Sequence, residues 1–465
     1  MKNVDIVVIG GGPAGFAAAM SARNTYPDKS IALIRKEEIA LIPCGIPYTM
    51  HRLDTVEDDT LPDTPLLNAG IEIIIDSVTD RIEKTLCCSS GEGITFDRLV
   101  IATGSRPVLP PIPGSEKRGV YVVKKEMDSL RDLKEAVEGS SEVVIIGGGY
   151  VGVEFADEIL KEGKRVTIVD QLTHLLPLSL DPEFSEFVET AILDQGGELE
   201  LGSSVASIEG KDRIDAVLLD DGRRIPCDLV IVAVGFKPNH SLGRRLGLDI
   251  SPESGIVVDE YMRTSEPDIF AIGDCAEQHN CYTGENWPIL LASTAMAQGR
   301  LAGSNLYSIK VVKTFRGVLG TFATKVGETA IGVSGLTEAQ AQRMGVDYVV
   351  GTAEVPDRHP GKLADASTIV IKLVFSRFCH SLLGGQIKGG DSVGEMANIL
   401  AVMIQNEMTD MEIDTLQIGT HPLLTSSPVV YPIIGATVNA ITKWYPEEQR
   451  KPRTQKAEPA IAAMA

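Results

Sequence analysis

The sequence predicts an α/β protein with two Rossmann-like nucleotide-binding units, because one strand–loop–helix pattern occurs twice. A short apolar run begins each copy, at residues 4–9 and 143–146. A glycine-rich loop and then a helix-forming stretch follow each run, as in a parallel strand–helix–strand unit. With 465 residues, the chain is long enough for about three domains that each bury a core.

The first loop carries Gly10, Gly12 and Gly15, directly after the apolar run. The spacing G-x-G-x-x-G between a strand and a helix is typical of a dinucleotide-binding loop. The glycines allow a tight turn and a close approach of the backbone to a pyrophosphate, which the helix N-terminus stabilises. The next strand ends in Arg35, where an acid for the ribose is expected, so the acidic residues beginning with Glu37 are the candidates for that contact.

The second loop carries Gly147, Gly149 and Gly152, and the strand after its helix ends in Asp170. An acid at that place accepts hydrogen bonds from the ribose hydroxyls of an adenosine and repels a 2′-phosphate. Residues 171–173 offer no positive charge that could bind such a phosphate. The second loop therefore predicts NADH as the cofactor and disfavours NADPH.

Two further segments identify the kind of protein. Residues 95–104 form an apolar strand that ends in Ala-Thr-Gly, and residues 264–274 end in Gly-Asp after a second apolar strand, with Ala-Met-Ala-Gln-Gly-Arg following at 295–300. With the two glycine loops, these segments make residues 1 to about 440 resemble the FAD-dependent pyridine nucleotide–disulfide oxidoreductases. The resemblance implies a homodimer.

The same resemblance implies three domains. An FAD-binding domain is expected over residues 1–112 and 242–312, and an NAD-binding domain over 113–241. An α+β dimerisation domain is expected over 313–444. The remaining residues, 445–465, mix Pro, Glu, Lys and Ala without periodicity and are predicted to form a mobile tail.

Cofactor-binding residues follow from the resemblance position by position. Tyr150 matches an aromatic residue that covers the flavin until nicotinamide displaces it, and Glu154 matches an acid near the nicotinamide pocket. Plain packing for Tyr150 and a solvated helix acid for Glu154 are the alternatives. The residues implied for FAD are Gly10, Gly12, Pro13, Ala14, Gly15, Glu37, Ala102, Thr103, Gly104, Asp274 and Ala295. Those implied for NADH are Gly147, Gly149, Tyr150, Gly152, Glu154 and Asp170. Gly235 is a further predicted cofactor-binding residue.

Cys44 is the predicted redox centre, in the segment Pro-Cys-Gly-Ile-Pro-Tyr, and the next cysteine along the chain is Cys87. This arrangement resembles the single-cysteine branch of the family, which contains coenzyme A disulfide reductases, persulfide and sulfur reductases, NADH oxidases and NADH peroxidases. A lone thiol beside a flavin cycles through a thiolate, a sulfenic acid, or a mixed disulfide or persulfide. The nucleophile is the thiolate, so this chemistry requires a lowered pKa of Cys44.

The first loop helps to choose among the members of this branch. Oxidases and peroxidases commonly carry a histidine inside this loop, where Pro13 stands in this chain and cannot transfer a proton. The sequence therefore favours an FAD-dependent NADH oxidoreductase that reduces coenzyme A disulfide, a persulfide or a polysulfide. The alternatives are an NADH oxidase or peroxidase that uses a Cys44 sulfenic acid, and a non-catalytic NAD redox sensor.

Two histidines are the predicted proton donors. His359 stands where coenzyme A disulfide reductases often have a tyrosine, and Thr420 stands at a second such position, so coenzyme A remains a candidate partner only. His421-Pro422 is similar to the His-Pro pair that protonates the departing thiolate in two-cysteine reductases, although Ser426 replaces the expected glutamate. Imidazole suits proton donation near neutral pH. A structural or surface role is the alternative for both histidines.

Charge and cysteine usage bound the location and the partners. The net charge of −21 argues against nucleic acid and against an anionic membrane, because both require a cationic surface. No uncharged run reaches the roughly 18 residues of a transmembrane helix. Seven cysteines without regular spacing fit neither a disulfide framework nor a metal site, which favours a reducing cytoplasm.

Overall fold

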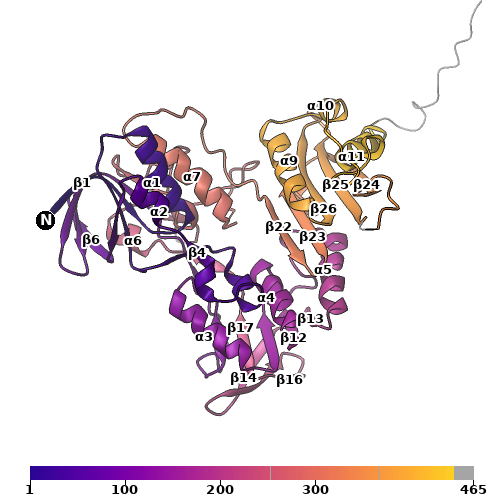
Figure 1. Ribbon diagram of the computed structural model, residues 1–465, viewed down its shortest axis with the longest axis horizontal. Helices are drawn as coiled ribbons and strands as arrows, with labels where there is room; N and C mark the ends of the chain where they lie inside the picture. Colours follow the sequence, from indigo (N-terminus) through magenta and orange to yellow (C-terminus); the bar gives the residue numbers. More distant parts are fainter. Residues whose placement is uncertain (252, 288, 365, 445–465) are drawn as a thin grey trace, which may run out of the picture. The chain divides into compact units, whose positions relative to one another are not determined.

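The computed structural model describes residues 1–251, 253–287, 289–364 and 366–444 (Figure 1). The chain divides into two compact units, one from Met1 to Ala330 and one that begins at Ile331. The α/β class is confirmed, whereas the boundaries of the three predicted domains stay predictions. The predicted mobile tail, 445–465, lies outside the described residues.

The first sheet of the N-terminal unit contains the first glycine loop. Strands β5, β2, β1 and β8 pair in parallel in this order, and β21 joins β8 in parallel. An antiparallel pair, β7 and β6, extends the sheet beyond β8. The bounds are β1 Lys2–Ile9, β2 Ile31–Arg35, β5 Glu72–Ile75, β6 Val78–Ile82, β7 Thr85–Cys88, β8 Gly93–Ile101 and β21 Ile269–Ala271. The helices along this part are α1 Pro13–Thr25, α2 Thr64–Asn68, α6 Ser241–Arg245 and α7 Ala292–Ser304.

Strand β1 is apolar along most of its length because both faces of its sheet are covered. Val7 and Ile9 belong to one buried cluster, and Ile6 and Val8 belong to another. A central parallel strand that is buried on both faces shows a continuous apolar run and no alternation. This packing fixes the carboxyl end of β1, where the first glycine loop begins.

The second sheet contains the second glycine loop and is entirely parallel, in the order β10-β17-β11-β12-β13. A three-stranded antiparallel sheet, β14-β15-β16, follows β13. The strand bounds are β10 Val120–Val122, β11 Glu142–Ile146, β12 Arg165–Asp170, β13 Glu198–Leu201, β14 Val205–Gly210, β15 Ile214–Leu219, β16 Arg224–Pro226 and β17 Leu229–Val232. The helices are α3 Met127–Glu138, α4 Tyr150–Lys161 and α5 Pro182–Asp194.

Short strand pairs and 3-10 turns complete the N-terminal unit. They include the pairs β3 Ala40–Leu41 with β4 Thr60–Leu61, β9 Ser105–Pro107 with β18 Phe236–Pro238, and β19 Ile250–Ser251 with β20 Gly255–Ile256. The 3-10 turns are η1 Ile46–Met50, η2 Val56–Asp59 and η3 Gly273–Cys275. Strand β22, Phe322–Val326, lies near the end of this unit.

The C-terminal unit is an α+β structure. Its strands follow the order β23-β26-β25-β24, and β24 to β26 pair in antiparallel fashion. Helix α11 packs closely on β24, because a Cβ built at Gly351 would lie 2.0 Å from the Ala436 carbonyl oxygen. The bounds are β23 Thr329–Gly335, β24 Tyr348–Pro356, β25 Thr368–Ser376, β26 Leu382–Gly389, α8 Glu338–Arg343, α9 Val393–Gln405, α10 Asp410–Asp414, η4 Pro428–Val430 and α11 Pro432–Ile441.

Candidate active site

In the first glycine loop, Gly10 and Gly15 pack tightly against backbone atoms, whereas Gly12 faces open space. A Cβ at Gly10 would lie 2.1 Å from the Ala102 carbonyl oxygen, and one at Gly15 would lie 2.0 Å from the Gly10 carbonyl oxygen. Gly12, the N-cap of α1, has no atom within 4 Å of such a Cβ, and no side chain caps the helix. Pro13 and Ala14 begin the helix. The loop thus presents bare backbone and a helix N-terminus, which fits the pyrophosphate of a dinucleotide.

Three residues implied for FAD come from distant parts of the chain and meet at this loop. A Cβ at Gly273 would lie 2.9 Å from the Ala14 Cβ and 3.3 Å from the Ala295 Cβ. Asp274 follows Gly273 in η3, directly after β21, and its Oδ2 accepts a hydrogen bond of 2.7 Å from the Ser105 hydroxyl. The structure therefore brings the first loop, the Gly-Asp segment and helix α7 together, as an FAD site requires.

A buried amide network holds the Gly-Asp segment in place, and the sequence analysis missed it. The Gln298 Oε1 accepts a hydrogen bond of 2.7 Å from the Gly273 amide, and the Gln298 side-chain amide donates to the Gln278 Oε1 at 3.0 Å. Gln278 donates in turn to the Gly273 carbonyl oxygen at 3.0 Å. Because both glutamines are buried, these bonds replace lost hydration and fix the segment against α7. Single polar residues in a helix carry no sequence signal for such a role.

The residue that replaces the expected ribose acid has a structural role. The Arg35 guanidinium is buried and forms a bidentate pair with the Asp63 carboxylate, with N···O distances of 2.6 and 2.7 Å. It also donates to the carbonyl oxygens of Glu37 and Glu38, at 2.9 and 2.6 Å. Arg35 therefore shapes the segment that follows β2, and the role of Glu37 in binding ribose stays a prediction.

The second glycine loop repeats the geometry of the first. A Cβ at Gly147 would lie 2.6 Å from the Ala233 carbonyl oxygen, one at Gly152 would lie 1.9 Å from the Gly147 carbonyl oxygen, and Gly149 faces open space. The Asp170 carboxylate accepts hydrogen bonds from the Gly148 amide at 2.6 Å and from the Leu172 amide at 2.8 Å. These bonds fix an acid beside the loop, and the whole arrangement fits an adenosine ribose and a pyrophosphate.

A pair of short strands, β9 and β18, links the two sheets. The predicted cofactor-binding residues Gly104 and Gly235 directly precede these strands. Strand β9 pairs with β18, so the Ala102-Thr103-Gly104 segment lies beside the segment that follows Gly235. The Thr103 hydroxyl donates to the Asn239 carbonyl oxygen at 2.8 Å, and the Asn239 amide donates to the Gly104 carbonyl oxygen at 2.8 Å. Gly104 and Gly235 both have a left-handed backbone, with φ of 67° and 102°, which favours glycine at these turns.

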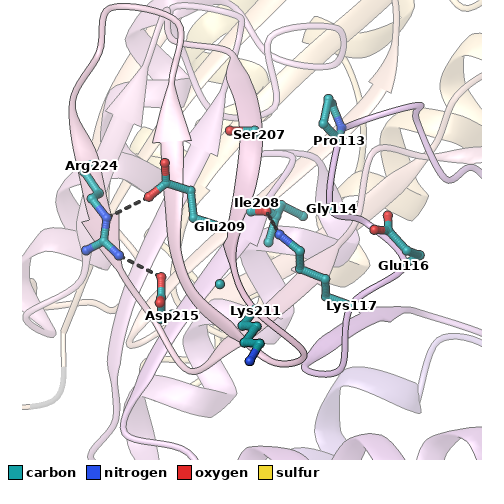
Figure 2. A pocket seen from close by; sticks show the side chains of 11 residues that line it. Pro113, Gly114, Glu116, Lys117, Ser207, Ile208, Glu209, Lys211, Asp215 and Arg224 are labelled. Atoms are coloured by element: carbon teal, nitrogen blue, oxygen red, sulfur yellow. Dashed lines mark hydrogen bonds and ion pairs between the residues drawn. The ribbon is translucent and has the colours of Figure 1, made fainter.

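An open cleft in the N-terminal unit lies away from the predicted site residues. Figure 2 shows it beside strand β14. The Arg224 guanidinium at its edge is paired with Glu209 and Asp215, at 2.8 and 2.7 Å, and the Lys117 ammonium donates to the Ile208 carbonyl oxygen at 2.8 Å. These charged groups are therefore bound to other groups of the protein, and we assign this cleft no part in the chemistry.

Tyr150 and Glu154 lie on one helix, α4, which begins at the second glycine loop. The Tyr150 ring packs edge-on against Phe322, with ring centroids 4.2 Å apart. The Glu154 carboxylate accepts a hydrogen bond of 2.8 Å from the Thr324 hydroxyl. Burial raises the pKa of Glu154 to about 7, against the smaller lowering effect of Thr324. Glu154 is thus a partly buried acid with a raised pKa, and its role near the nicotinamide stays a prediction.

Cys44 lies in a turn that a short strand pair supports. The turn follows β3, and the Gly45 amide donates to the Ile42 carbonyl oxygen at 2.9 Å before η1 begins at Ile46. The Cys44 side chain is exposed, and among the described residues all seven cysteines are free thiols. Cys44 therefore has no disulfide partner among the described residues.

Charged groups from both nucleotide-binding regions influence the pKa of Cys44. Although Cys44 is exposed, the surrounding protein displaces part of the water around its thiol, and this desolvation raises the pKa of Cys44. The carboxylates of Glu154, Asp59 and Asp274 raise it further. The Lys125 ammonium opposes them; it lies 3.4 Å from the Asp274 carboxylate. The lowered pKa that the sequence analysis required is therefore not supplied by the protein groups, which together disfavour the thiolate. Lys125 and Asp59 were missed because neither belongs to a motif.

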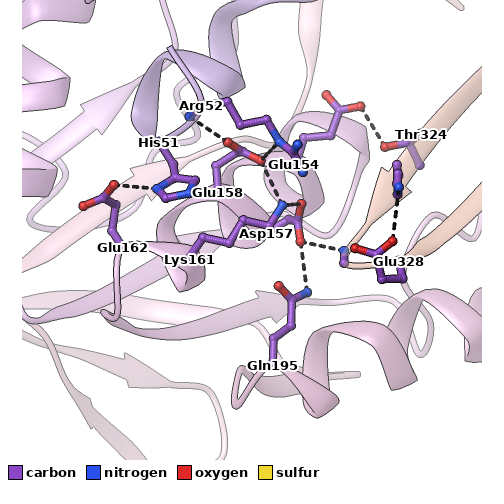
Figure 3. Close-up of polar contacts among 12 residues, drawn as sticks. His51, Arg52, Glu154, Asp157, Glu158, Lys161, Glu162, Gln195, Thr324 and Glu328 are labelled. Atoms are coloured by element: carbon purple, nitrogen blue, oxygen red, sulfur yellow. Dashed lines mark hydrogen bonds and ion pairs between the residues drawn. The ribbon is translucent and has the colours of Figure 1, made fainter. Parts of the chain in front are cut away.

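Polar contacts fasten the segment after Cys44 to helix α4, as Figure 3 shows. The Arg52 Nε donates to the fully buried Glu158 carboxylate at 2.8 Å, and the His51 Nδ1 lies 2.6 Å from a Glu162 oxygen. Lys161 also pairs with Glu158, at 3.0 Å. A buried carboxylate that loses one of two cations is costly, so these pairs hold η1 and α4 together.

The two predicted histidines lie together in the C-terminal unit. The His359 Nδ1–H donates to the Thr425 carbonyl oxygen at 3.1 Å, and the His421 amide donates to the Thr425 hydroxyl at 3.0 Å. The His421 Nδ1 accepts a hydrogen bond of 3.2 Å from the Leu423 amide, so a neutral His421 carries its proton on Nε2. Ser426, which replaces the expected glutamate, is buried and forms no side-chain bond within the described part of the chain.

Comparisons with known proteins agree with this geometry. Residues 4–299 match the pyridine nucleotide-disulphide oxidoreductase family, and residues 321–430 match the dimerisation domain of the same family. An NADH oxidase of Methanocaldococcus jannaschii is 32% identical over 456 residues, which cover 94% of this chain and 98% of the relative. A CoA-dependent NAD(P)H sulfur oxidoreductase of Pyrococcus abyssi is 32% identical over 416 residues, with 87% and 91% covered.

A solved structure supports the fold over nearly the whole chain. The NAD-dependent persulfide reductase from A. fulgidus has a TM-score of 0.86 and 30% sequence identity to this chain. The match covers 94% of this chain and 83% of that protein. Within the described residues, every helix is too short or too polar to cross a bilayer.

Proposed function

Because the chain belongs to the pyridine nucleotide-disulphide oxidoreductase family, we propose that it reduces a small sulfur compound through the single cysteine Cys44. It is an oxidoreductase that uses FAD and a nicotinamide cofactor. The proposed substrates are coenzyme A disulfide, a persulfide or a polysulfide. A homodimer in a reducing cytoplasm is part of the proposal; the matching dimerisation domain and the free cysteines support it.

The observation that carries this proposal is the position of the Cys44 segment, which is paired with helix α4 through His51 and Arg52. Asp274 and Glu154 both act on the charge of the Cys44 thiol. Asp274 comes from the segment implied for FAD, and Glu154 comes from the helix implied for NADH. An exposed thiol beside both sites is where electrons from a nicotinamide can reach an external sulfur compound. Bound FAD would pass the two electrons of NADH to this sulfur.

The proposed reaction at Cys44 is a thiol–disulfide exchange. The Cys44 thiolate attacks one sulfur of the acceptor, so that a bond from Cys44 to that sulfur forms and the acceptor S–S bond breaks. The second sulfur leaves as a thiolate or hydrosulfide and takes up one proton. Two electrons then cleave the new S–S bond, which returns Cys44 to the thiolate and releases the remaining sulfur fragment as a thiolate.

We assign the proton for the leaving thiolate to His421, contributed across the dimer, with His359 beside it. The Nε2–H of His421 is the suitable donor, because Nδ1 already accepts from Leu423. His421 is exposed, and Thr425 holds both histidines in one loop cluster. No carboxylate orients His421 within the described residues; backbone bonds take that role.

An oxidase is the second candidate, because several relatives carry the name NADH oxidase, including the one from M. jannaschii. In that reading oxygen is reduced and Cys44 cycles through a sulfenic acid. Pro13 disfavours it, since the first residue of α1 offers no group that could handle a peroxide proton. The third candidate is a non-catalytic NAD redox sensor. The presence of both glycine loops together with an exposed thiol disfavours it, because a sensor requires no flavin and no reacting cysteine.

One experiment separates these functions. NADH consumption would be measured without oxygen in the presence of coenzyme A disulfide, a glutathione persulfide or polysulfide, and compared with an assay that contains oxygen alone. We expect fast turnover with one sulfur acceptor and slow turnover with oxygen. Fast oxygen consumption without sulfur reduction would replace the proposal by the oxidase, and an absence of turnover would favour the sensor.

The NADH preference gives a separate prediction. Asp170→Asn is expected to raise the KM for NADH by about tenfold or more, because a hydrogen bond to a charged group contributes about 1.5–3 kcal/mol. The same change removes the charge that repels a 2′-phosphate, so the KM for NADPH should fall relative to NADH. Glu198→Gln, an exposed acid on the neighbouring strand β13, is the control and should leave both KM values unchanged. An unaltered ratio in Asp170→Asn would contradict the assignment of Asp170.

A further inference from the structure

Asp59 is a buried acid that none of the motifs explains. It is the last residue of η2, and the residue is only 2% exposed. Its Oδ2 is buried and has no hydrogen-bond partner among the described residues. Leaving a buried carboxyl oxygen unpaired costs free energy, so such a group requires an explanation.

Asp59 lies directly against the turn that carries Cys44. A Cβ built at Gly45 would lie 1.8 Å from the Asp59 Oδ1, so the carboxyl group occupies the space beside the residue that follows Cys44. The backbone of Asp59 touches the same turn, because its carbonyl oxygen accepts a hydrogen bond of 3.0 Å from the Ile42 amide. The strand pair β3–β4 holds these two segments in register.

Helix α3 packs against η2, and its cations bind groups other than the Asp59 carboxylate. On α3, the Arg131 guanidinium pairs with Glu57 at 2.5 Å, and the Lys134 ammonium donates to the Thr49 carbonyl oxygen at 2.8 Å. Lys134 also donates to the carbonyl oxygens of Leu53 and Asp54, both at 3.0 Å. No cation in the described part of the chain therefore pairs with Asp59.

The other charged groups near η2 and the Cys44 turn do not pair with Asp59 either. On η2 itself, the exposed Asp58 accepts from Thr55. After η1, His51 and Arg52 pair with acids of α4. Across the turn, Glu154 and Asp274 add negative charge, and Lys125 adds the opposing positive charge.

The two titratable groups influence each other. Burial raises the pKa of Asp59 to about 7, and the Asp59 carboxylate is one of the charges that raise the pKa of Cys44. Two neighbouring anions disfavour each other, so a proton on one group favours the charge on the other. Asp59 and Cys44 are therefore linked, because the charge state of Asp59, which changes near neutral pH, alters the pKa of the Cys44 thiol.

We propose that Asp59 is a positioning residue that sets the charge of Cys44, by binding a proton when Cys44 becomes a thiolate. Reduction of a Cys44–sulfur bond creates the thiolate, and Asp59 then takes up one proton from solvent. When the thiolate attacks the next acceptor, the negative charge leaves with the departing thiolate, and Asp59 returns its proton to solvent. The inference rests on Cys44 being the reacting sulfur of the proposed function.

The test is the pH dependence of Cys44 alkylation by iodoacetamide in the FAD-loaded enzyme. Peptide mass spectrometry would follow Cys44 separately from the exposed Cys379. Asp59→Asn is expected to lower the alkylation midpoint by about one pH unit. Alkylation should become about tenfold faster near pH 9, where the wild-type Asp59 is ionised, and only about twofold faster at pH 7, where about half of the Asp59 carboxyls are already protonated. Glu57→Gln removes an exposed acid from the same turn and should leave the midpoint unchanged.

Two outcomes would overturn the inference. One is an equal midpoint in Asp59→Asn and in the wild-type enzyme. The other outcome applies if Asp59→Asn does not fold. In that case the alkylation rate of the wild-type enzyme is fitted against pH, and a fit to a single ionisation would overturn the inference, because the linked pair requires two. The assay needs no sulfur acceptor, so it can succeed even where the proposed acceptors fail, and the two failures stay distinguishable.

Discussion

Cys44→Ser is expected to abolish the reduction of sulfur acceptors and to leave FAD bound. A serine hydroxyl forms no bond to sulfur under these conditions and cannot accept electrons, so we expect a loss of about 10³-fold or more. The turn should keep its shape, because the backbone bond from Gly45 to Ile42 and the strand pair β3–β4 do not involve the Cys44 side chain. The measurement is anaerobic NADH oxidation with the preferred acceptor, together with the flavin absorbance of the purified protein.

Cys379→Ser is the matched control for this variant. Cys379 is also exposed and lies between β25 and β26 in the C-terminal unit, where hydrogen bonds with Ser376 and Ser381 lower its pKa. It should react readily with alkylating agents, yet its replacement should leave turnover unchanged. Full acceptor turnover in Cys44→Ser would show that the reacting sulfur lies elsewhere, and the proposed mechanism would fail.

Gly152→Ala is expected to destabilise the protein and to remove the binding of NADH. The added methyl group would lie 1.9 Å from the Gly147 carbonyl oxygen, and both atoms belong to the glycine loop itself. Because backbone atoms must move to make room, we expect a cost of about 1–3 kcal/mol or more and a distorted loop. FAD should remain bound, since its own loop belongs to the first sheet. Urea unfolding and rapid-mixing measurements of flavin reduction by NADH would test both effects.

Gly149→Ala is the comparison for Gly152→Ala, because its methyl group would clash with the bound ligand and not with the protein. Its Cβ would face open space, so the free energy of unfolding should change by less than about 0.5 kcal/mol. NADH should still bind more weakly, because the methyl group stands where the pyrophosphate approaches the backbone. A Gly152→Ala protein that is as stable as the wild type and binds NADH equally well would contradict the assigned loop.

The parts of this protein that the sequence predicts well are those that local physics dictates. Gly10, Gly15, Gly147 and Gly152 occupy positions where a side chain would collide with backbone, and the apolar runs form strands that are buried on both faces. Their spacing along the chain is a direct consequence of the turn that they form. Both nucleotide loops could therefore be located without a structure.

The contacts between distant segments could not be predicted in this way. Arg35 stands at the position of a ribose ligand and instead pairs with Asp63, and Gln298 meets Gly273 only after α7 has packed. The direction of the Cys44 pKa could not be predicted either, because it depends on burial and on four charged groups that lie far from Cys44 in the sequence. Nothing in one sequence reports the sum of such contributions.

The packing of α1 against α7 has a consequence for how the protein is made. A Cβ at Gly299 would lie 2.5 Å from the Ala14 carbonyl oxygen, and one at Gly303 would lie 2.4 Å from the Ala18 carbonyl oxygen, so the two helices meet along their backbones. The ribosome releases α1 long before α7, with the whole second sheet synthesised in between. The second sheet is continuous in the chain and can fold as it emerges, whereas the first must wait for α7 and β21. During that delay α1 remains without α7, against which its backbone packs in the folded protein.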